Sequence, residues 1–172
     1  MKYFVALVLM VFLLSCNQAV DISTREKKPT SRTDSLIKFN QEFLIVENQY
    51  IEDYILRHDL QMQKTGTGLR YQIVKPGNGA KAEPEKIVKF NYTVSFLTGT
   101  VCYSSKRDGP KSFKISRSTV ESGLNEGILL LRVGDHAKFI LPSHLAFGAT
   151  GDHDQIPPRA VLVYDVEILE IK

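Results

Sequence analysis

Residues 88–96 alternate strictly between apolar and polar side chains. The apolar positions are Val88, Phe90, Tyr92, Val94 and Phe96, and the positions between them are Lys89, Asn91, Thr93 and Ser95. Side chains of a β-strand point alternately to opposite faces of the sheet, so this period of two indicates a strand with one buried face. The pattern therefore predicts that Tyr92 points into the interior.

Four further segments have the character of strands: residues 69–74, 112–116, 136–142 and 160–171. In the last of them Leu162, Tyr164, Val166 and Ile168 share one face, while Asp165 and Glu167 lie on the other. Residues 119–135 contain Gly123 and Gly127 and end in a Gly-Asp turn, which leaves room for one brief helix. The expected fold class is therefore α+β: an antiparallel sheet of about five strands with a short helix across one face.

Residues 34–62 show a different period. Apolar side chains recur at helical spacing, at Leu36, Phe39, Phe43, Val46, Tyr50, Tyr54 and Leu60, with no proline or glycine among them. We expect one long helix or a pair of helices, and we assign residues 34–64 to an N-terminal helical segment. Its apolar face is buried on its own domain, in a homodimer or against a client protein, and the sequence leaves these three open.

The first fifteen residues resemble a secretory signal peptide. One lysine precedes an apolar run that is shorter than the ~20 residues that a membrane-spanning helix needs. The run ends in Leu-Leu-Ser before Cys16, which resembles a bacterial lipobox and implies that Cys16 is acylated and becomes the mature N-terminus. Residues 16–33 then form the lipidated cysteine and a flexible polar tether.

Charge and cysteine content exclude several classes of protein. The net charge of +3 comes from scattered basic residues, which argues against a nucleic-acid partner. Of the two cysteines, Cys102 has no partner in the chain if Cys16 carries lipid, so no structural disulfide is expected. No histidine spacing indicates a metal site.

The C-terminal part resembles a known family. The segments VGDHAKFILP, FGATG, IPP and LVYDVEIL follow one another in the order found in FK506-binding-protein domains, which are FKBP-type peptidyl-prolyl cis/trans isomerases. The resemblance runs from about Leu69 to Lys172, within a domain assigned to residues 65–172, and implies a half-wrapped antiparallel sheet around a short helix, with an apolar pocket between them. It implies no metal and no cofactor. A small group of FKBP-like lipoproteins linked to gliding motility also has a helical segment before this domain.

The resemblance also implies the site residues. An apolar pocket would be lined by Tyr92, Phe113, Val120, Leu124, Phe147, Ile156 and Tyr164. Glu121 would offer its backbone N–H to a bound ligand. Alternation places Tyr92, Phe113 and Tyr164 on inward faces independently of the resemblance.

Four departures from the family pattern affect this pocket. Cys102 and Tyr103 stand where the family commonly has Phe-Asp, Leu124 replaces a tryptophan, Glu121 an isoleucine, and Phe147 a tyrosine. An acid and a hydroxyl are thereby lost, so we expect weak or absent binding of the family's macrolide ligands. Asp152 and Asp154 are expected to be solvated loop residues.

Two functions remain open from the sequence. The first is a prolyl isomerase that assists the folding of exported, proline-containing polypeptides. The second is a catalytically weak binding module, chaperone or component of an envelope machine such as the gliding apparatus. The lipid anchor implies a periplasm-facing lipoprotein of the cell envelope, and Asn17 after the lipidated cysteine favours the outer membrane over the inner.

Overall fold

The computed structural model describes residues 32–117 and 120–172. The predicted signal peptide, the lipidated Cys16 and most of the tether lie outside the described residues. The chain divides into two units, Met1–Lys38 and Phe39–Lys172. Of the first unit, the structure describes only the beginning of helix α2 (Arg32–Arg57). Among the described residues, no helix is both long and apolar enough to cross a membrane.

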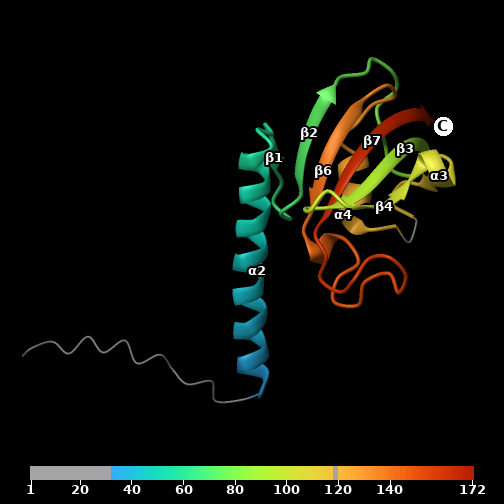
Figure 1. The fold of residues 1–172 in the computed structure, drawn as a ribbon. Coiled ribbons are helices and arrows are strands. Elements are labelled where there is room, and N and C mark those ends of the chain that lie inside the picture. The colour runs from blue at the N-terminus through green and yellow to red at the C-terminus, as the bar shows by residue number, and fades with distance from the viewer. Residues whose placement is uncertain (1–31, 118–119) are drawn as a thin grey trace, which may run out of the picture. The chain divides into compact units, whose positions relative to one another are not determined.

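An antiparallel sheet forms the body of the second unit (Figure 1). Its strands follow the order β1-β2-β6-β7-β3-β4, and β5 also pairs with β3. Their bounds are β1 Gln63–Lys64, β2 Arg70–Lys75, β3 Ile87–Phe96, β4 Val101–Ser104, β5 Lys111–Lys114, β6 His136–Leu141 and β7 Leu162–Ile171. The short helices are α3 Ser105–Asp108, α4 Ser122–Ile128 and the 3-10 helix η1 Ser143–Leu145. The expected α+β class is confirmed. The five expected strands are present, and the sheet has two further strands, β1 and β4.

The alternation along β3 and β7 positions the interior as predicted. Val88, Phe90, Tyr92 and Val94 are buried, and so are Leu162, Tyr164, Val166 and Ile168. The two strands are adjacent, with Val94 opposite Tyr164 and Tyr92 opposite Val166. One face of the two central strands therefore carries both predicted pocket tyrosines.

Helix α4 packs closely against the inner face of β6. A Cβ atom placed on Gly127 would lie 2.8 Å from ring carbons of Phe139, and one on Gly123 would lie 2.7 Å from Leu141. Distances this short leave no room for a side chain, so the two glycines allow the helix to approach the sheet. This approach places Leu124 in the interior.

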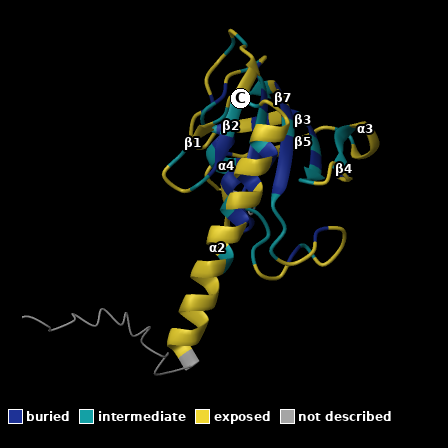
Figure 2. Ribbon diagram, turned by 60° about the vertical axis from the view of Figure 1, so that its left-hand side comes forward, coloured by how far each residue is buried: buried dark blue, intermediate teal, exposed yellow. Residues whose placement is uncertain are grey.

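Helix α2 covers part of the outer face of the same sheet. Ile51 and Tyr54 pack with Ile140 of β6 and Val163 of β7 in a second buried cluster. Figure 2 shows that most of the helix is exposed and that its buried residues lie toward its C-terminal end. The sheet thus buries side chains on both faces where α2 and α4 flank it.

The predicted apolar face of this helix is buried only in part: Tyr54 and Leu60 lie in or against the second cluster, but other predicted positions are exposed. Phe39, Val46 and Tyr50 are 56%, 49% and 60% exposed, whereas Glu47 and Ile51 are buried. The face that packs on the sheet is partly polar, because Glu47 accepts a hydrogen bond from the backbone N–H of Ser143 at 3.0 Å. A period of apolar residues alone does not detect a contact face that uses carboxylates.

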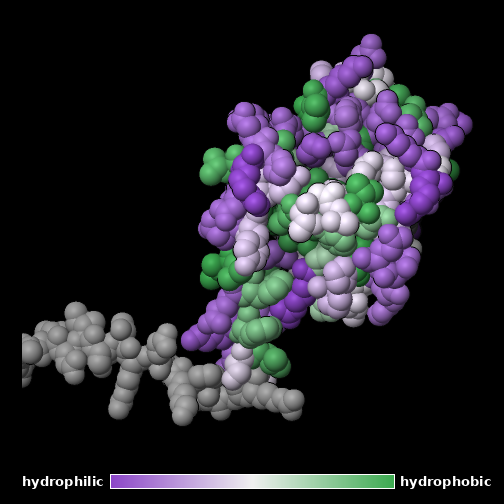
Figure 3. All heavy atoms as spheres, in the orientation of Figure 1, coloured by the Kyte–Doolittle hydropathy of each residue, from purple (hydrophilic) through white to green (hydrophobic). Residues whose placement is uncertain are grey.

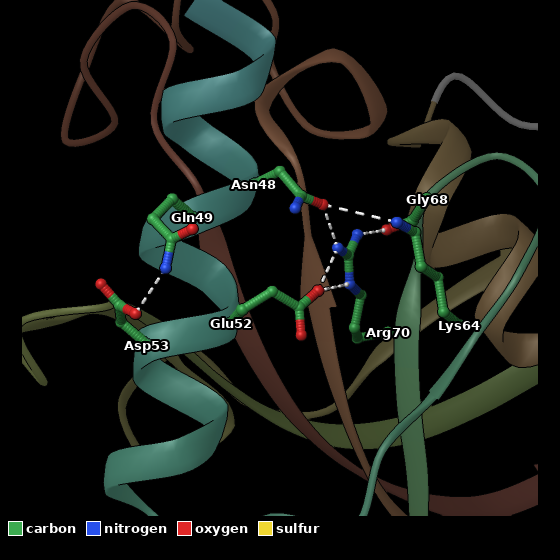
Figure 4. Close-up of polar contacts among 7 residues, drawn as sticks. All are labelled: Asn48, Gln49, Glu52, Asp53, Lys64, Gly68 and Arg70. Carbon is green, nitrogen blue, oxygen red and sulfur yellow. Dashed lines mark hydrogen bonds and ion pairs between the residues drawn. The ribbon is translucent and has the colours of Figure 1, made fainter.

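A buried arginine joins α2 to the edge of the sheet (Figure 4). The guanidinium of Arg70 donates to Glu52 Oε1 at 2.5 and 3.2 Å. It also donates to the side chain of Asn48 and to the backbone carbonyl of Gly68. Arg70 is 3% exposed, so these partners satisfy a charge that burial would otherwise destabilise.

The helical segment is shorter than predicted. Helix α2 ends at Arg57, Asp59 adopts a positive φ of 50°, and residues assigned to the end of the segment form β1 instead. Figure 3 shows hydrophobic side chains interspersed with polar ones along α2. Ile45 and Leu56 are among those most exposed, at 70% and 81%. A homodimer or client contact through this surface stays a prediction.

Candidate active site

The structure brings all seven predicted lining residues into one cluster. Five of them are buried in it: Tyr92 from β3, Phe113 from β5, Leu124 from α4, Tyr164 from β7 and Ile156 from the loop before β7. The other two, Val120 and Phe147, are partly buried and pack against it. Their common placement agrees with a pocket wall, while their role in binding stays a prediction.

Aromatic rings fix the geometry at one side of this cluster. Phe113 meets Phe90 edge-on, with ring centroids 5.8 Å apart and planes at 89°. Phe90 in turn lies 5.9 Å from the ring of Tyr92. The ammonium of Lys111 stands over the Tyr92 ring, 4.8 Å from its centroid. Edge-to-face and cation–π arrangements of this kind hold the ring orientations in place.

Glu121 directs its side chain into the cluster. Its Oε1 accepts a hydrogen bond of 2.6 Å from the hydroxyl of Tyr164. Burial raises the pKa of Tyr164 well above its ordinary value, and the nearby Glu121 carboxylate raises it further. The phenol therefore stays protonated and acts as a donor. The family-derived expectation for Glu121 concerned its backbone N–H alone, so this side-chain contact is an addition.

Tyr103 holds the loop of residues 147–158. Its hydroxyl donates to Asp152 Oδ2 and lies 3.2 Å from Asp154 Oδ2. The other oxygen of Asp152 accepts from the backbone N–H groups of Asp154 and Ile156 at 2.9 and 2.7 Å. Burial raises the pKa of Asp152, but these hydrogen bonds lower it more, so the net shift is downward.

Two expectations about this loop need correction. Asp152 is half-buried and bonded rather than freely solvated. The sequence indicated that the family's acid next to Cys102 is lost; the strand lacks it, but the loop supplies the Asp152 carboxylate, which bonds to Tyr103, the residue in its place. Gly151 contributes to the same turn: its φ is +71°, and a Cβ there would lie 2.2 Å from the carbonyl oxygen of Ile156.

Cys102 is an inert neighbour of the site. It is 3% exposed and its Sγ lies 3.3 Å from the carbonyl oxygen of Val94, to which it donates. Burial raises the pKa of its thiol, and an adjacent backbone hydrogen bond lowers it less. A thiol held protonated is a poor nucleophile.

The described residues contain no cluster of three or more histidine, cysteine, aspartate or glutamate side chains that could hold a metal ion. A hollow of about 380 Å³ is lined mostly by polar residues, among them Thr93, His136, Asp165 and Glu167, and also by Tyr92 of the cluster. Lys138 donates to Asp165 there at 2.7 Å. Apart from Tyr92 its lining is polar, so the aromatic cluster is the better candidate for binding a proline ring.

Sequence reasoning missed both carboxylate–tyrosine pairs. Glu121 and Tyr164 are 43 residues apart, and Tyr103 and Asp152 are 49 apart. One signal could have indicated the first pair: the sequence places the carboxylate of Glu121 and the hydroxyl of Tyr164 at two positions that both belong to the predicted pocket. No local pattern marks the second.

Comparisons with known proteins agree with this geometry. The family profile of FKBP-type peptidyl-prolyl cis-trans isomerases matches residues 78–169. The FKBP-type peptidyl-prolyl cis-trans isomerase FkpA of Aeromonas hydrophila is 39% identical over 83% of this chain and 53% of its own length. FK506-binding protein 1A of Emericella nidulans is 37% identical over 60% of this chain and 98% of its own length.

Among solved structures, the crystal structure of FkpA from Escherichia coli has a TM-score of 0.66 and 26% identity. It covers 99% of this chain, which spans 81% of that structure. The chain spans 53% and 40% of the lengths of the Aeromonas hydrophila and Neisseria meningitidis relatives that it matches. The profile covers more than half of the chain, and it includes every strand from β3 to the greater part of β7. The chain therefore belongs to the family of FKBP-type peptidyl-prolyl cis-trans isomerases.

Proposed function

We propose that this chain catalyses the cis/trans isomerisation of X–Pro peptide bonds. The observation that carries the proposal is the convergence of Tyr92, Phe113 and Tyr164 from three strands on one apolar cluster. The loop before β7 contributes Ile156 to the same cluster, and Phe147 packs against it.

The reaction needs shape and polarity rather than a nucleophile. Rotation about the C–N bond costs ~18–20 kcal/mol because resonance gives that bond double-bond character. The twisted amide has lost this resonance and its charge separation, so an apolar wall favours it over the planar forms. A thousandfold acceleration requires only about 4 kcal/mol of such preference.

The residues divide this task between them. Phe113 and Tyr92 form the aromatic wall for the proline ring, and Leu124 on α4 forms the floor. The loop anchored by Tyr103 and Asp152 borders the cluster. Because Leu124 is smaller than the family's tryptophan, a bound proline ring would lose the indole contact and keep the apolar contacts of the other wall residues.

A protease-coupled peptide assay with matched variants tests this proposal. We expect Phe113→Leu to lower kcat/KM by tenfold or more, which corresponds to about 1.4 kcal/mol. Phe90→Leu is the control, because Phe90 is a buried phenylalanine that touches Phe113 but does not line the predicted pocket. A wild-type rate equal to that of buffer, or equal losses in the two variants, would contradict the proposal.

One observation favours the second candidate function, a binding module with weak catalysis. The Tyr103 hydroxyl and the Asp152 carboxylate bond to each other, which leaves fewer polar groups to orient a bound peptide. An aggregation assay with an unfolded client separates the two functions. Suppression of aggregation by a protein that does not accelerate prolyl exchange would support the binding module.

We further propose that the protein is a periplasm-facing lipoprotein of the cell envelope and assists the folding of exported, proline-containing proteins. The apolar run before Cys16 and the polar residues after it support this location. Labelled palmitate should enter the wild-type protein and not Cys16→Ser. Equal labelling of the two would exclude lipidation at this cysteine.

A further inference from the structure

The contact between Glu121 and Tyr164 places a carboxylate in an otherwise apolar cluster. Tyr164 is 3% exposed, and its hydroxyl donates its proton to Glu121 Oε1 at 2.6 Å. Glu121 itself is half-buried, so its carboxylate lies between the buried phenol and solvent. The pair thus links a buried phenol of the cluster to a partly exposed carboxylate.

Two ordinary structural explanations do not account for this carboxylate. Glu121 precedes α4 at the N-cap position, yet its side chain accepts no capping hydrogen bond from the helix. It also forms no ion pair with a lysine or arginine within residues 32–117 and 120–172. Its one described side-chain hydrogen bond comes from Tyr164, which is neutral.

The remaining capacity of Glu121 is that of an acceptor for a cation. An ionised carboxylate accepts at about four lone-pair positions on two oxygens and donates none. Tyr164 occupies one position on Oε1 and fixes the orientation of the group, while burial keeps the phenol protonated as a donor. Oε2 has no partner among the described residues and suits an ammonium or guanidinium group.

The other charges near the cluster make this position selective. Lys111 lies over the Tyr92 ring and 5.7 Å from the centroid of Tyr103, on the β4–β5 side. Asp108 interacts with Lys111, and Asp152 and Asp154 lie against Tyr103, so both signs of charge meet on that side. On the α4 side the Glu121 carboxylate has no described lysine or arginine beside it, so a cationic side chain of a bound peptide is attracted there and an acidic one is repelled. The flanks of the predicted proline position therefore differ in charge.

We propose that Glu121 is a specificity-determining residue that favours prolyl peptides with a lysine or arginine next to the proline, and that Tyr164 positions its carboxylate. This proposal rests on the proposed function, since it assumes that the aromatic cluster binds the proline. It adds the chemical class of the neighbouring side chain, which a wholly apolar pocket would not select.

Matched peptides test the preference. Each pair differs only in lysine or glutamine, placed before the proline in one pair and after it in the other. For at least one of the two placements, we expect the wild-type protein to have a kcat/KM roughly two- to fivefold higher for the lysine peptide, as a partly exposed ion pair supplies. Raised salt should reduce this ratio, because screening weakens charge pairs.

Variants separate a specificity role from a structural one. Glu121→Gln should bring the ratio to about one, and Tyr164→Phe should reduce it by freeing the carboxylate. Glu83→Gln is the control, because Glu83 is an exposed carboxylate outside the cluster, and it should keep the wild-type ratio. A ratio near one for both placements in the wild type, or an unchanged ratio in Glu121→Gln, would overturn the proposal.

Binding measurements keep this test independent of catalysis. Fluorescence anisotropy with the same labelled peptides reports the lysine preference even if no rate is accelerated. A preference in binding without turnover would refute the isomerase function and support the role of Glu121. Turnover without any lysine preference would support the isomerase function and refute the role of Glu121.

Discussion

Gly127→Ala tests whether the close approach of α4 to the sheet is a structural requirement. The added Cβ would lie 2.8 Å from two carbons of the Phe139 ring, which is fully buried and has no free space to move into. Overpacking of a dense core costs ~1–3 kcal/mol, and contacts this short place the cost near the upper end. Alanine recovers about 1 kcal/mol in helix propensity. The expected net loss is about 2 kcal/mol in the free energy of unfolding.

Urea unfolding measures this loss. With a slope of roughly 1–3 kcal/mol per molar, the midpoint should fall by about 1 M. Gly66→Ala is the matched control, because no atom lies within 4 Å of the position that its Cβ would take and its φ is not positive. We expect the control to leave the midpoint unchanged or slightly raised. An unchanged midpoint in Gly127→Ala would refute the close-packing argument, and an equal fall in the control would show that the effect is not steric.

Three further changes have defined outcomes. Arg70→Met should lower the free energy of unfolding by about 2 kcal/mol, since buried hydrogen bonds to a charge are lost. In the same urea titration, Arg117→Met is the control: Arg117 is exposed, and its loss should cost less than about 0.5 kcal/mol. Asp165→Asn should remove stability that the wild-type protein has above about pH 4 and loses below it. Burial raises the pKa of Asp165, but its bonds to a lysine and a histidine lower that pKa more, so the net shift is downward. The stability advantage of the wild type should therefore vanish as acid protonates the Asp165 carboxylate. An advantage that persists at pH 2 would contradict this. Tyr103→Phe should increase hydrogen exchange at Asp154 and Ile156, because the carboxylate that binds their N–H groups loses its anchor; unchanged exchange would show that the anchor is dispensable.

The period of two in the strands predicted most of the interior. Tyr92 and Tyr164 were placed on inward faces by alternation, and the structure buries both. This works because an antiparallel strand with one buried face repeats its environment at every second residue. Strand β4 escaped prediction because Val101, Cys102 and Tyr103 follow one another without a polar residue between them, so the strand shows no period of two.

The contact face of α2 and the polar pairs of the site could not be predicted in this way. Helix α2 has apolar residues around much of its circumference, so several faces fit the period equally well. The face that packs was decided by tertiary partners: Ser143 for Glu47, and Arg70 for Glu52. Likewise, Glu121 meets Tyr164 only because α4 and β7 come together in space.

The central claim is that this chain accelerates prolyl isomerisation through its aromatic cluster. Two-dimensional NMR exchange spectroscopy on a short X–Pro peptide measures the cis/trans interconversion rate directly, without a coupled protease. We predict exchange on the millisecond-to-second timescale with catalytic amounts of the wild-type protein, against tens of seconds or more without it, and a markedly slower rate with Phe113→Leu than with Phe90→Leu. An interconversion rate that stays at the uncatalysed value at every protein concentration would contradict the claim.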